Sequence, residues 1–234
     1  MLPSTRGEKL PSRQSMESTE QYCVIAIDGP AASGKSSVAR ELSRRLDFVY
    51  VNSGAMYRAV TWSVFNRGIE ATDKEAIGKF IDAAKLDGKF IDGEFHLLID
   101  DVDLTPHLHE ERVNAEVSRV STVPEVRRRL VERMRESSAG HDLVIEGRDI
   151  ASVVFPDTPY KFYIDASPEV RAQRRAAQGH RDEIAQRDRA DSSRATSPLI
   201  IAKDAEVIDT SHVTVEQVVD KILARLKRKG FTRA

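Results

Sequence analysis

The chain is poor in cysteine and in long apolar runs. Its single cysteine, Cys23, excludes a disulfide framework, and its place inside a short apolar run predicts a small buried strand residue. No stretch reaches the roughly 20 apolar residues that a membrane-spanning helix needs, and the N-terminus lacks the apolar block of a secretory signal. A formal net charge of −1 gives no overall field that would favour a nucleic-acid polymer or a membrane as partner. These absences predict a cytoplasmic enzyme or binding protein.

Residues 1–20 lack the apolar pattern that a core needs. They are polar and rich in serine, contain Pro3 and Pro11, and show no apolar period. Such a segment cannot bury enough surface to offset the entropy of ordering, so we expect a disordered extension, with Met16 as an alternative start. The whole chain is 40% hydrophobic and 31% charged, which suits a globular protein with a sizeable core. Because no unexplained apolar stripe is visible, we expect a monomer.

From residue 21 onward, short apolar runs alternate with helical periods. Buried strands are predicted at 22–28, 48–52, 142–146, 160–165 and 205–209. Helices are predicted over 36–46 and 55–66, and after Thr122, Ser167 and Thr214. Strands that alternate with helices form βαβ units, so we predict an α/β fold with a parallel sheet flanked by helices.

Two of these helices have start signals in the sequence. Thr122-Val-Pro-Glu125 has the pattern of a capping box with proline in the first turn, and it precedes an apolar face. Thr214 and Gln217 have the same capping-box spacing. The helix that follows carries a single apolar stripe, formed by Val215, Val218, Val219, Ile222, Leu223 and Leu226.

One region breaks the alternation. Residues 85–104 contain two runs of alternating polarity around Asp92-Gly93, which is typical of an antiparallel hairpin. We therefore expect a subdomain with a small antiparallel sheet, inserted at 73–119 into a core formed by 21–72 and 120–234.

The stretch GPAASGKSS, residues 29–37, matches a phosphate-binding loop (P-loop). It follows a predicted strand and precedes a predicted helix, which is the context that this motif requires. Backbone N–H groups of such a loop turn toward phosphates, Lys35 can reach the β- and γ-phosphates, and the Ser36 hydroxyl can ligate Mg²⁺. The predicted ATP-binding residues are Gly29, Pro30, Ala31, Ala32, Ser33, Gly34, Lys35, Ser36 and Ser37.

The loop alone does not distinguish a motor, a switch and a transferase. A GTPase would carry a guanine-reading Asn-Lys-x-Asp segment, which the sequence lacks, and 234 residues are few for a mechanical ATPase. Phosphoryl transfer to a small acceptor fits better, because it needs mainly positioning and charge neutralisation by Mg²⁺, lysine and arginine.

Arginines that could hold phosphates lie near the ends of predicted elements. Arg58 stands near the start of the second helix, and Arg148 follows the strand at 142–146. Arg187, Asp191 and Arg194 have i, i+4, i+7 spacing, so on a helix they would share one face. The sequence has no His/Cys cluster typical of a structural metal site.

Together these segments resemble the bacterial cytidylate kinase family of P-loop nucleoside monophosphate kinases. The resemblance is carried by IAIDGPAASGKSS (25–37), NSGAMYRAV (52–60), VPEVRRRL (123–130), EGRDIASVVFP (146–156) and RDRADSSRATSPL (187–199). It implies transfer of the ATP γ-phosphate to CMP or dCMP, giving ADP and CDP or dCDP. It also implies that the insertion binds the acceptor and that a short lid, about 174–190, closes over ATP.

The resemblance further implies roles for individual residues. Lys35, Arg148 and Arg187 would be catalytic. The acceptor would be held by Ser53 at the sugar, by Arg58, Arg148 and Arg194 at the phosphate, by Arg187 and Asp191 at the sugar hydroxyls, and by Ser118, Arg127 and Asp149 at the cytosine edge. Such a carboxylate and donors suit cytosine, which presents an amino group beside acceptors.

The sequence departs from the family pattern at two informative positions. Glu146 stands where the family usually has aspartate, and His109 stands where an arginine is common, which removes a permanent positive charge near the acceptor. We expect His109 to be a surface residue. Two other functions stay open: a kinase for UMP, AMP or a non-nucleotide acceptor, and a nucleotide-dependent binding or regulatory module.

Overall fold

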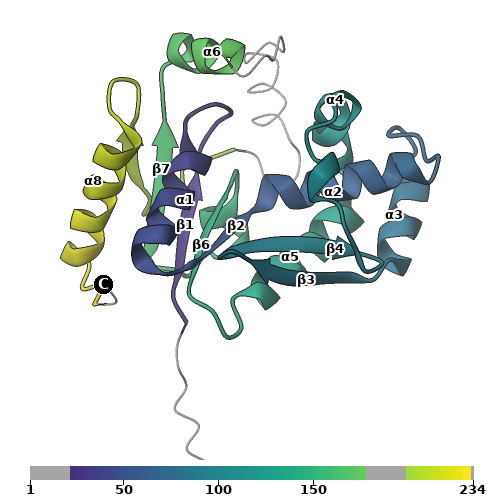
Figure 1. The fold of residues 1–234 in the computed structure, drawn as a ribbon, viewed down its shortest axis with the longest axis horizontal. Coiled ribbons are helices and arrows are strands. Elements are labelled where there is room, and N and C mark those ends of the chain that lie inside the picture. Colours follow the sequence, from purple (N-terminus) through teal and green to yellow (C-terminus); the bar gives the residue numbers. More distant parts are fainter. Residues whose placement is uncertain (1–21, 178–198, 233–234) are drawn as a thin grey trace, which may run out of the picture.

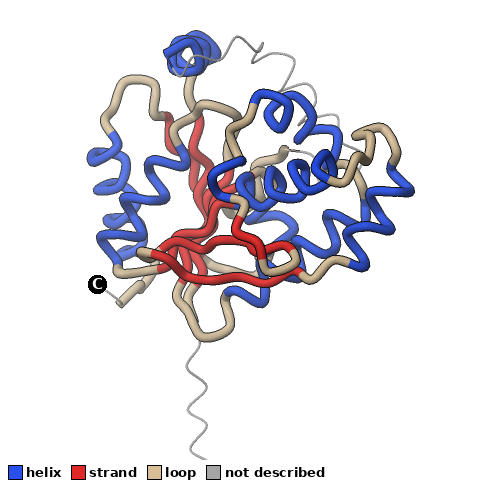
Figure 2. The backbone as a smooth tube through the Cα atoms, turned by 45° about the vertical axis from the view of Figure 1, so that its right-hand side comes forward, coloured by secondary structure: helices blue, strands red, loops and turns tan. Residues whose placement is uncertain are grey.

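A single mixed sheet forms the centre of the molecule. The structure, a computed structural model, describes residues 22–177 and 199–232. The sheet has the strand order β3-β4-β2-β6-β1-β7-β8, and helices pack on both of its faces (Figures 1 and 2). Its parallel strands are β1 (Val24–Asp28), β2 (Val49–Asn52), β6 (Leu143–Gly147), β7 (Tyr160–Asp165) and β8 (Glu206–Asp209). The predicted α/β class is confirmed.

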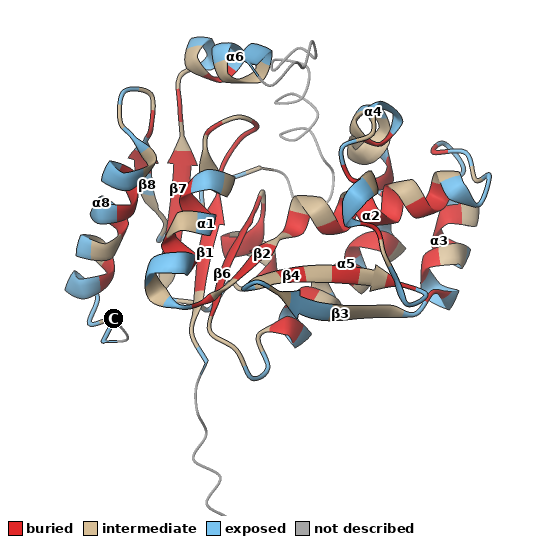
Figure 3. Cartoon of the chain, in the orientation of Figure 1, coloured by how far each residue is buried: buried red, intermediate tan, exposed pale blue. Residues whose placement is uncertain are grey.

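Alternate side chains of the central strands enter two separate cores. In β1, Ile25 and Ile27 pack with α1 (Lys35–Leu46) and α8 (Val215–Arg228), whereas Ala26 packs with α2 (Ser53–Asn66) and α5 (Pro124–Ser137). Successive strand residues point to opposite faces, and both faces are covered, so these strands are apolar throughout. Figure 3 shows β1 and β7 as buried ribbons between partly exposed helices.

The predicted hairpin is present and extends the sheet. β3 (Leu86–Ile91) pairs antiparallel with β4 (Glu94–Ile99), and Asp92 and Gly93 take the positive φ angles, 49° and 77°, that a tight hairpin turn requires. A short β5 (Val102–Asp103) also pairs with β4. β4 in turn pairs in parallel with β2 through Tyr50 and Glu94. The hairpin thus continues the main sheet beyond β2.

The remaining helices surround the hairpin and the sheet. α3 (Lys74–Ala83) and α4 (Glu111–Val120) lie with α2 and α5 around the hairpin side (Figure 1). η1 (Thr105–His107) precedes α4, the π-helix η2 (Ile150–Val154) follows β6, and α6 (Pro168–Ala177) follows β7. No helix within the described ranges is both long and apolar enough to cross a membrane.

Two local predictions are wrong. Thr122 does not cap α5: the N-cap residue is Val123, and the Thr122 hydroxyl donates to the Arg119 carbonyl at 2.7 Å. The hydroxyl therefore serves the end of α4 rather than the start of α5. Cys23 is only half-buried and lies just before β1, not in a strand. The capping box of Thr214 and Gln217, by contrast, is confirmed at the start of α8.

Candidate active site

The loop of residues 29–37 joins the carboxyl end of β1 to the first turn of α1. Gly34, the N-cap of α1, has a φ of 91°, and Ala32 also takes a positive φ of 58°. A side chain at Gly29 would place its Cβ 2.1 Å from the Ile164 carbonyl oxygen, so only glycine fits there. The start of α1 adds the partial positive charge of a helix N-terminus to the loop. This is the geometry of a phosphate-binding loop.

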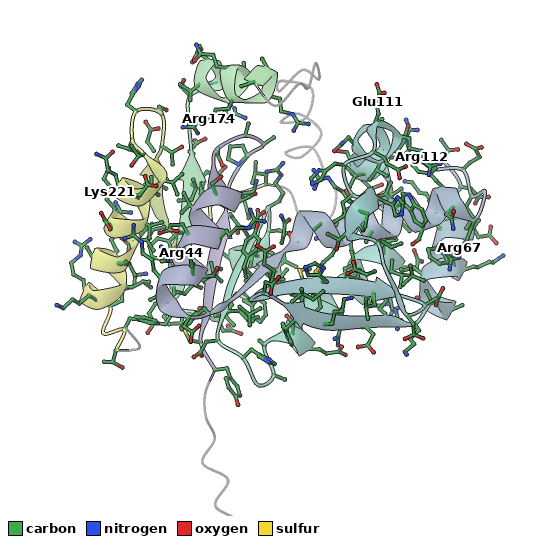
Figure 4. The ribbon with its side chains drawn as sticks, viewed as in Figure 1. Arg44, Arg67, Glu111, Arg112, Arg174 and Lys221 are labelled. Carbon is green, nitrogen blue, oxygen red and sulfur yellow. The ribbon has the colours of Figure 1, made fainter. Side chains whose placement is uncertain are left out.

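Two arginines of α6 support that loop from its far side. Arg171, which is 6% exposed, donates to the Ala31 carbonyl at 3.4 Å, and Arg174 donates to the Ser33 carbonyl at 3.2 Å. Arg174 also donates to the Thr210 carbonyl at 2.7 Å, and the Thr210 hydroxyl donates to Ser33 at 2.7 Å. Figure 4 shows Arg174 on the side of α6 that faces the loop. These bonds fix the loop to the carboxyl ends of β7 and β8.

Side-chain oxygen atoms that could ligate a metal ion lie beside Lys35. The Ser36 hydroxyl lies 2.7 Å from Glu146 Oε1, and Lys35 Nζ lies 3.7 Å from the same carboxylate. The Tyr50 hydroxyl lies 3.4 Å from Glu146 Oε1, and burial together with this carboxylate raises the pKa of Tyr50, which keeps the phenol protonated. The glutamate that departs from the family pattern therefore reaches Ser36.

This oxygen set fits Mg²⁺. Among residues 22–177 and 199–232, no group of three or more His, Cys, Asp or Glu side chains could hold a metal ion by itself. Mg²⁺ commonly uses one or two protein oxygens and completes its shell with water and phosphate oxygens. A hydroxyl and a carboxylate at the P-loop meet that requirement.

A cavity of about 530 Å³ extends from the loop across to α4 and α5. Its lining from the donor side includes Ala31, Ala32, Gly34, Lys35, Ser36 and Ser37. Its lining from the facing side includes Ser53, Arg58, Ser118, Arg127, Arg148 and Asp149. The cavity thus brings together residues that lie more than a hundred positions apart in the sequence.

The start of α2 forms one wall of this cavity. Ser53 donates from its hydroxyl to the Glu146 carbonyl at 2.8 Å, and a Cβ at Gly147 would lie 2.5 Å from that hydroxyl. Arg58 donates to the side-chain oxygen of Asn114 on α4 at 3.4 Å. His109 is exposed as expected, but it also lines the cavity, where partial desolvation and the charge of Arg58 lower its pKa. The lowered pKa favours the neutral form of His109, whereas Arg58 places a permanent positive charge on this wall.

A buried ion pair closes the far end of the cavity. The Arg127 guanidinium of α5 donates to the Asp149 carboxylate, and the two side chains are only 7% and 8% exposed. Between this pair and the loop, Arg148 donates to the Gly29 carbonyl at 2.6 Å. The pair presents a donor and an acceptor to the cavity side by side.

A second cavity, of about 380 Å³, lies beside the loop. Valines line much of it, and Arg174 and Thr210 add polar groups. This cavity borders Gly34 and Ser37, so it is continuous with the donor side of the loop. A flat, largely apolar group attached to the bound phosphates would fit there.

Some predicted site residues either do not line the large cavity or lie outside the described residues. Gly29, Pro30 and Ser33 belong to the loop but do not line the large cavity. Arg187, Asp191 and Arg194, and most of the predicted lid, lie outside the described residues.

Sequence reasoning missed some residues that hold the site together. Asp28, 2% exposed, accepts hydrogen bonds from the backbone of Ile150 and Ala151, both at 2.8 Å. Its position directly before Gly29, at the end of β1, was the available signal. Arg171 also supports the loop directly, because its guanidinium donates to the Ala31 carbonyl.

The strand-loop-helix geometry, the Lys35–Ser36–Glu146 cluster and the facing arginine-lined cavity define a P-loop kinase that acts on a small anionic acceptor. A family model described as cytidylate kinase matches residues 25–228, and the chain belongs to that family.

Individual relatives agree with the family assignment. The cytidylate kinase of Pelotomaculum thermopropionicum is 43% identical over 214 residues, which cover 86% of this chain and 95% of the relative. Those of Mycobacterium leprae and Mycolicibacterium paratuberculosis are 40% and 43% identical, each covering 88% of this chain and 96% of the relative. Among solved structures, shikimate kinase from Acinetobacter baumannii has a TM-score of 0.47 and 13% identity, covering 92% of this chain and 99% of that one.

Proposed function

We propose that this chain transfers the γ-phosphate of ATP to CMP or dCMP, giving ADP and CDP or dCDP. The observation that carries the proposal is one cavity that joins the phosphate loop to the buried Arg127–Asp149 pair. The loop end suits a nucleoside triphosphate, and the pair suits a pyrimidine that carries an amino donor beside acceptors.

On the donor side, the loop amides and Lys35 would hold the β- and γ-phosphates. The second cavity, between Val38 and Val213, would receive adenosine. Ser36 and Glu146 would hold Mg²⁺, Ser36 directly and Glu146 directly or through water. Bound there, Mg²⁺ would supply positive charge against the β- and γ-phosphate oxygens.

On the acceptor side, charge and hydrogen bonding are divided between two groups of residues. Arg58 and Arg148 would hold the CMP phosphate, and Ser53 would contact the sugar. Arg127, Asp149 and Ser118 would read the cytosine: Asp149 accepts from the exocyclic amino group, and Arg127 donates to the ring acceptors. Arg148 also donates to the Gly29 carbonyl, so one side chain would contact both the phosphate loop and the acceptor phosphate.

The chemical step then needs no protein base. A phosphate oxygen of CMP is already anionic near neutral pH and attacks the γ-phosphorus as the bond to the ADP leaving oxygen breaks. Lys35 and the arginines stabilise the charge that spreads over the transferred group, and they reduce repulsion between the two anions. Arg187 and Arg194 would add to this charge, and Arg187 and Asp191 would bind the sugar hydroxyls.

A coupled assay of ADP release tests the proposal. The wild-type protein is assayed with ATP and Mg²⁺ together with CMP, dCMP, UMP, AMP or no acceptor. We expect the highest kcat/KM with CMP or dCMP and almost no release without acceptor. A preference for UMP or AMP would instead indicate another nucleotide kinase, and slow release independent of acceptor would indicate a nucleotide-dependent regulatory module. Size-exclusion chromatography of the same sample tests the expected monomer.

A further inference from the structure

The segment that carries Asp149 is an unusual helix held at both ends by distant side chains. η2 (Ile150–Val154) is a π-helix, a form that occurs mostly as single turns and often at functional sites. Its first N–H groups and last carbonyls have no partners within the helix, so other groups must satisfy them. Two side chains that do so for part of these groups lie on β1 and α5.

Asp28 holds the first turn. Its two carboxylate oxygens accept from Ile150 N and Ala151 N, each at 2.8 Å. Both N–H groups directly follow Asp149 in the chain, so Asp28 fixes the peptide planes on the carboxyl side of the proposed cytosine reader. Because Asp28 also directly precedes Gly29, this contact joins the acceptor end of the site to the base of the phosphate loop.

Arg135 holds the last turn. Its Nε donates to the Val154 carbonyl and its Nη2 to the Val153 carbonyl, each at 2.9 Å. The N–H groups of these same two residues donate back to the Asp149 carbonyl, at 2.9 Å from Val153 and 3.2 Å from Val154. A fork of two donors on adjacent carbonyls is geometry that arginine can make and lysine cannot fully reproduce.

α5 therefore contacts both ends of the segment. Arg127 pairs with the Asp149 side chain, and Arg135, eight residues further along the helix, grips the carbonyls that end η2. Arg135 is exposed and lies outside the cavity lining, so its contact with the site is indirect.

We propose that Asp28 and Arg135 are positioning residues that clamp η2 and thereby set the base selectivity of the acceptor site. These contacts fix the main chain of Asp149. The Asp149 carboxylate and the Arg127 guanidinium therefore keep the same relative positions when substrates bind and leave. The identity of the preferred base rests on the proposed function, whereas the restraint on η2 follows from these contacts alone.

The test uses the full chain with Arg135→Ala, Arg135→Lys and a matched control, Arg128→Ala. Arg128 lies on the same helix, its side chain is 52% exposed, and its ion pairs within residues 22–177 and 199–232 are with the side chains of Asp82 and Glu132, not with η2. We expect Arg135→Ala to lower the kcat/KM ratio of CMP over UMP about tenfold, as the loss of one to two hydrogen bonds would, with KM for ATP unchanged. Arg135→Lys should restore part of the ratio, and Arg128→Ala should stay within about twofold of wild type.

Hydrogen exchange of the backbone supplies a readout that does not depend on the acceptor. In Arg135→Ala, amides of residues 150–155 should exchange about tenfold faster, while those of the loop at 29–37 should not change. The restraint on η2 is overturned if Arg135→Ala matches Arg128→Ala in hydrogen exchange, and the role in base selectivity is overturned if the two variants match in the kcat/KM ratio of CMP over UMP. The proposal is also overturned if Arg135→Ala raises KM for ATP by the same factor by which it lowers the CMP-over-UMP ratio and also lowers the melting temperature. The substitution would then disturb the whole fold rather than η2. If the wild-type protein shows no preference for CMP, the proposed function fails, and the exchange comparison still decides whether Arg135 clamps η2.

Discussion

At the residue scale, a change at Lys35 tests the ATP side of the proposed reaction separately from CMP binding. Its side chain is 12% exposed and lies between the Pro30 carbonyl, at 3.4 Å, and the Glu146 carboxylate, at 3.7 Å. Lys35→Ala removes the charge that faces the β- and γ-phosphates, so we expect turnover to fall about a thousandfold or more. CMP binding, measured by titration calorimetry, should stay nearly intact. The control is Lys79→Ala, an exposed lysine on α3 that pairs with Glu75. Full activity of Lys35→Ala would remove Lys35 from the mechanism.

The Arg127–Asp149 pair gives a second prediction at this scale. Asp149→Ala should abolish the preference for CMP over UMP, because the acceptor for the cytosine amino group is lost. It should also lower the free energy of unfolding by about 3–5 kcal/mol, because it leaves the Arg127 charge buried without this partner. The measurements are kcat/KM with each acceptor and urea denaturation.

A double variant separates these two effects. Arg127→Met combined with Asp149→Ala removes both charges, so stability should recover in part while the preference does not. If Asp149→Ala keeps the preference for CMP, the cytosine is read elsewhere.

At the element scale, the two threonines with capping-box patterns form a matched pair. The Thr214 hydroxyl accepts from Gln217 N at 3.3 Å at the start of α8, whereas Thr122 caps nothing in α5. Thr214→Ala should therefore cost about 1 kcal/mol of stability, the usual value for a lost N-cap. Thr122→Ala should cost clearly less, since in the part of the chain that the structure describes its hydroxyl donates to the Arg119 carbonyl and caps no helix start. Urea denaturation of both variants measures the difference, and equal losses would contradict this interpretation of α5.

These two helices also show why elements are partly predictable. Proline in the first turn and the apolar period of α5 were sufficient to place the helix, although the cap was wrong. β7 was predicted to the residue because its apolar run has sharp polar ends. η2 was not predicted, because IASVV has no helical period of its own and depends on Asp28 and Arg135.

At the scale of the whole molecule, local patterns predicted the donor half of the site and little of the acceptor half. GPAASGKSS contains its own turn and helix start, so its geometry follows from nearby residues. Arg127 and Asp149 meet because α5 packs against η2, the segment that follows β6. No spacing in the sequence reveals this contact. The resemblance to a family named these residues, but it did not name Asp28, which links β1 to η2.

We expect Asp28 to make the stability of the whole fold depend on pH. Burial raises its pKa from 3.8 to about 7; Asp149 adds to this shift, while the N–H groups of Ala151 and Ile150 and the charge of Lys35 oppose it. Between about pH 4 and 7, the folded protein keeps a proton that the unfolded chain has lost, so this group destabilises the fold as pH rises. Relative to Asp28→Asn, the wild-type free energy of unfolding should fall by up to about 1.4 kcal/mol per pH unit across this window and level off above it. Urea denaturation of both proteins from pH 4 to 8 measures this difference.

Glu41 provides a control of opposite sign. Hydrogen bonds from Arg44 and Arg45 lower its pKa from 4.5 to about 2, so its contribution to stability is present above about pH 4.5 and is lost as pH falls toward 2. The difference between wild type and Glu41→Gln should therefore be flat from pH 5 to 7, where the difference for Asp28→Asn is steepest. A flat profile for Asp28→Asn as well would mean that Asp28 is ionised throughout this range. Its two backbone hydrogen bonds would then outweigh the cost of burying the charge, and the link between β1 and η2 would be independent of pH.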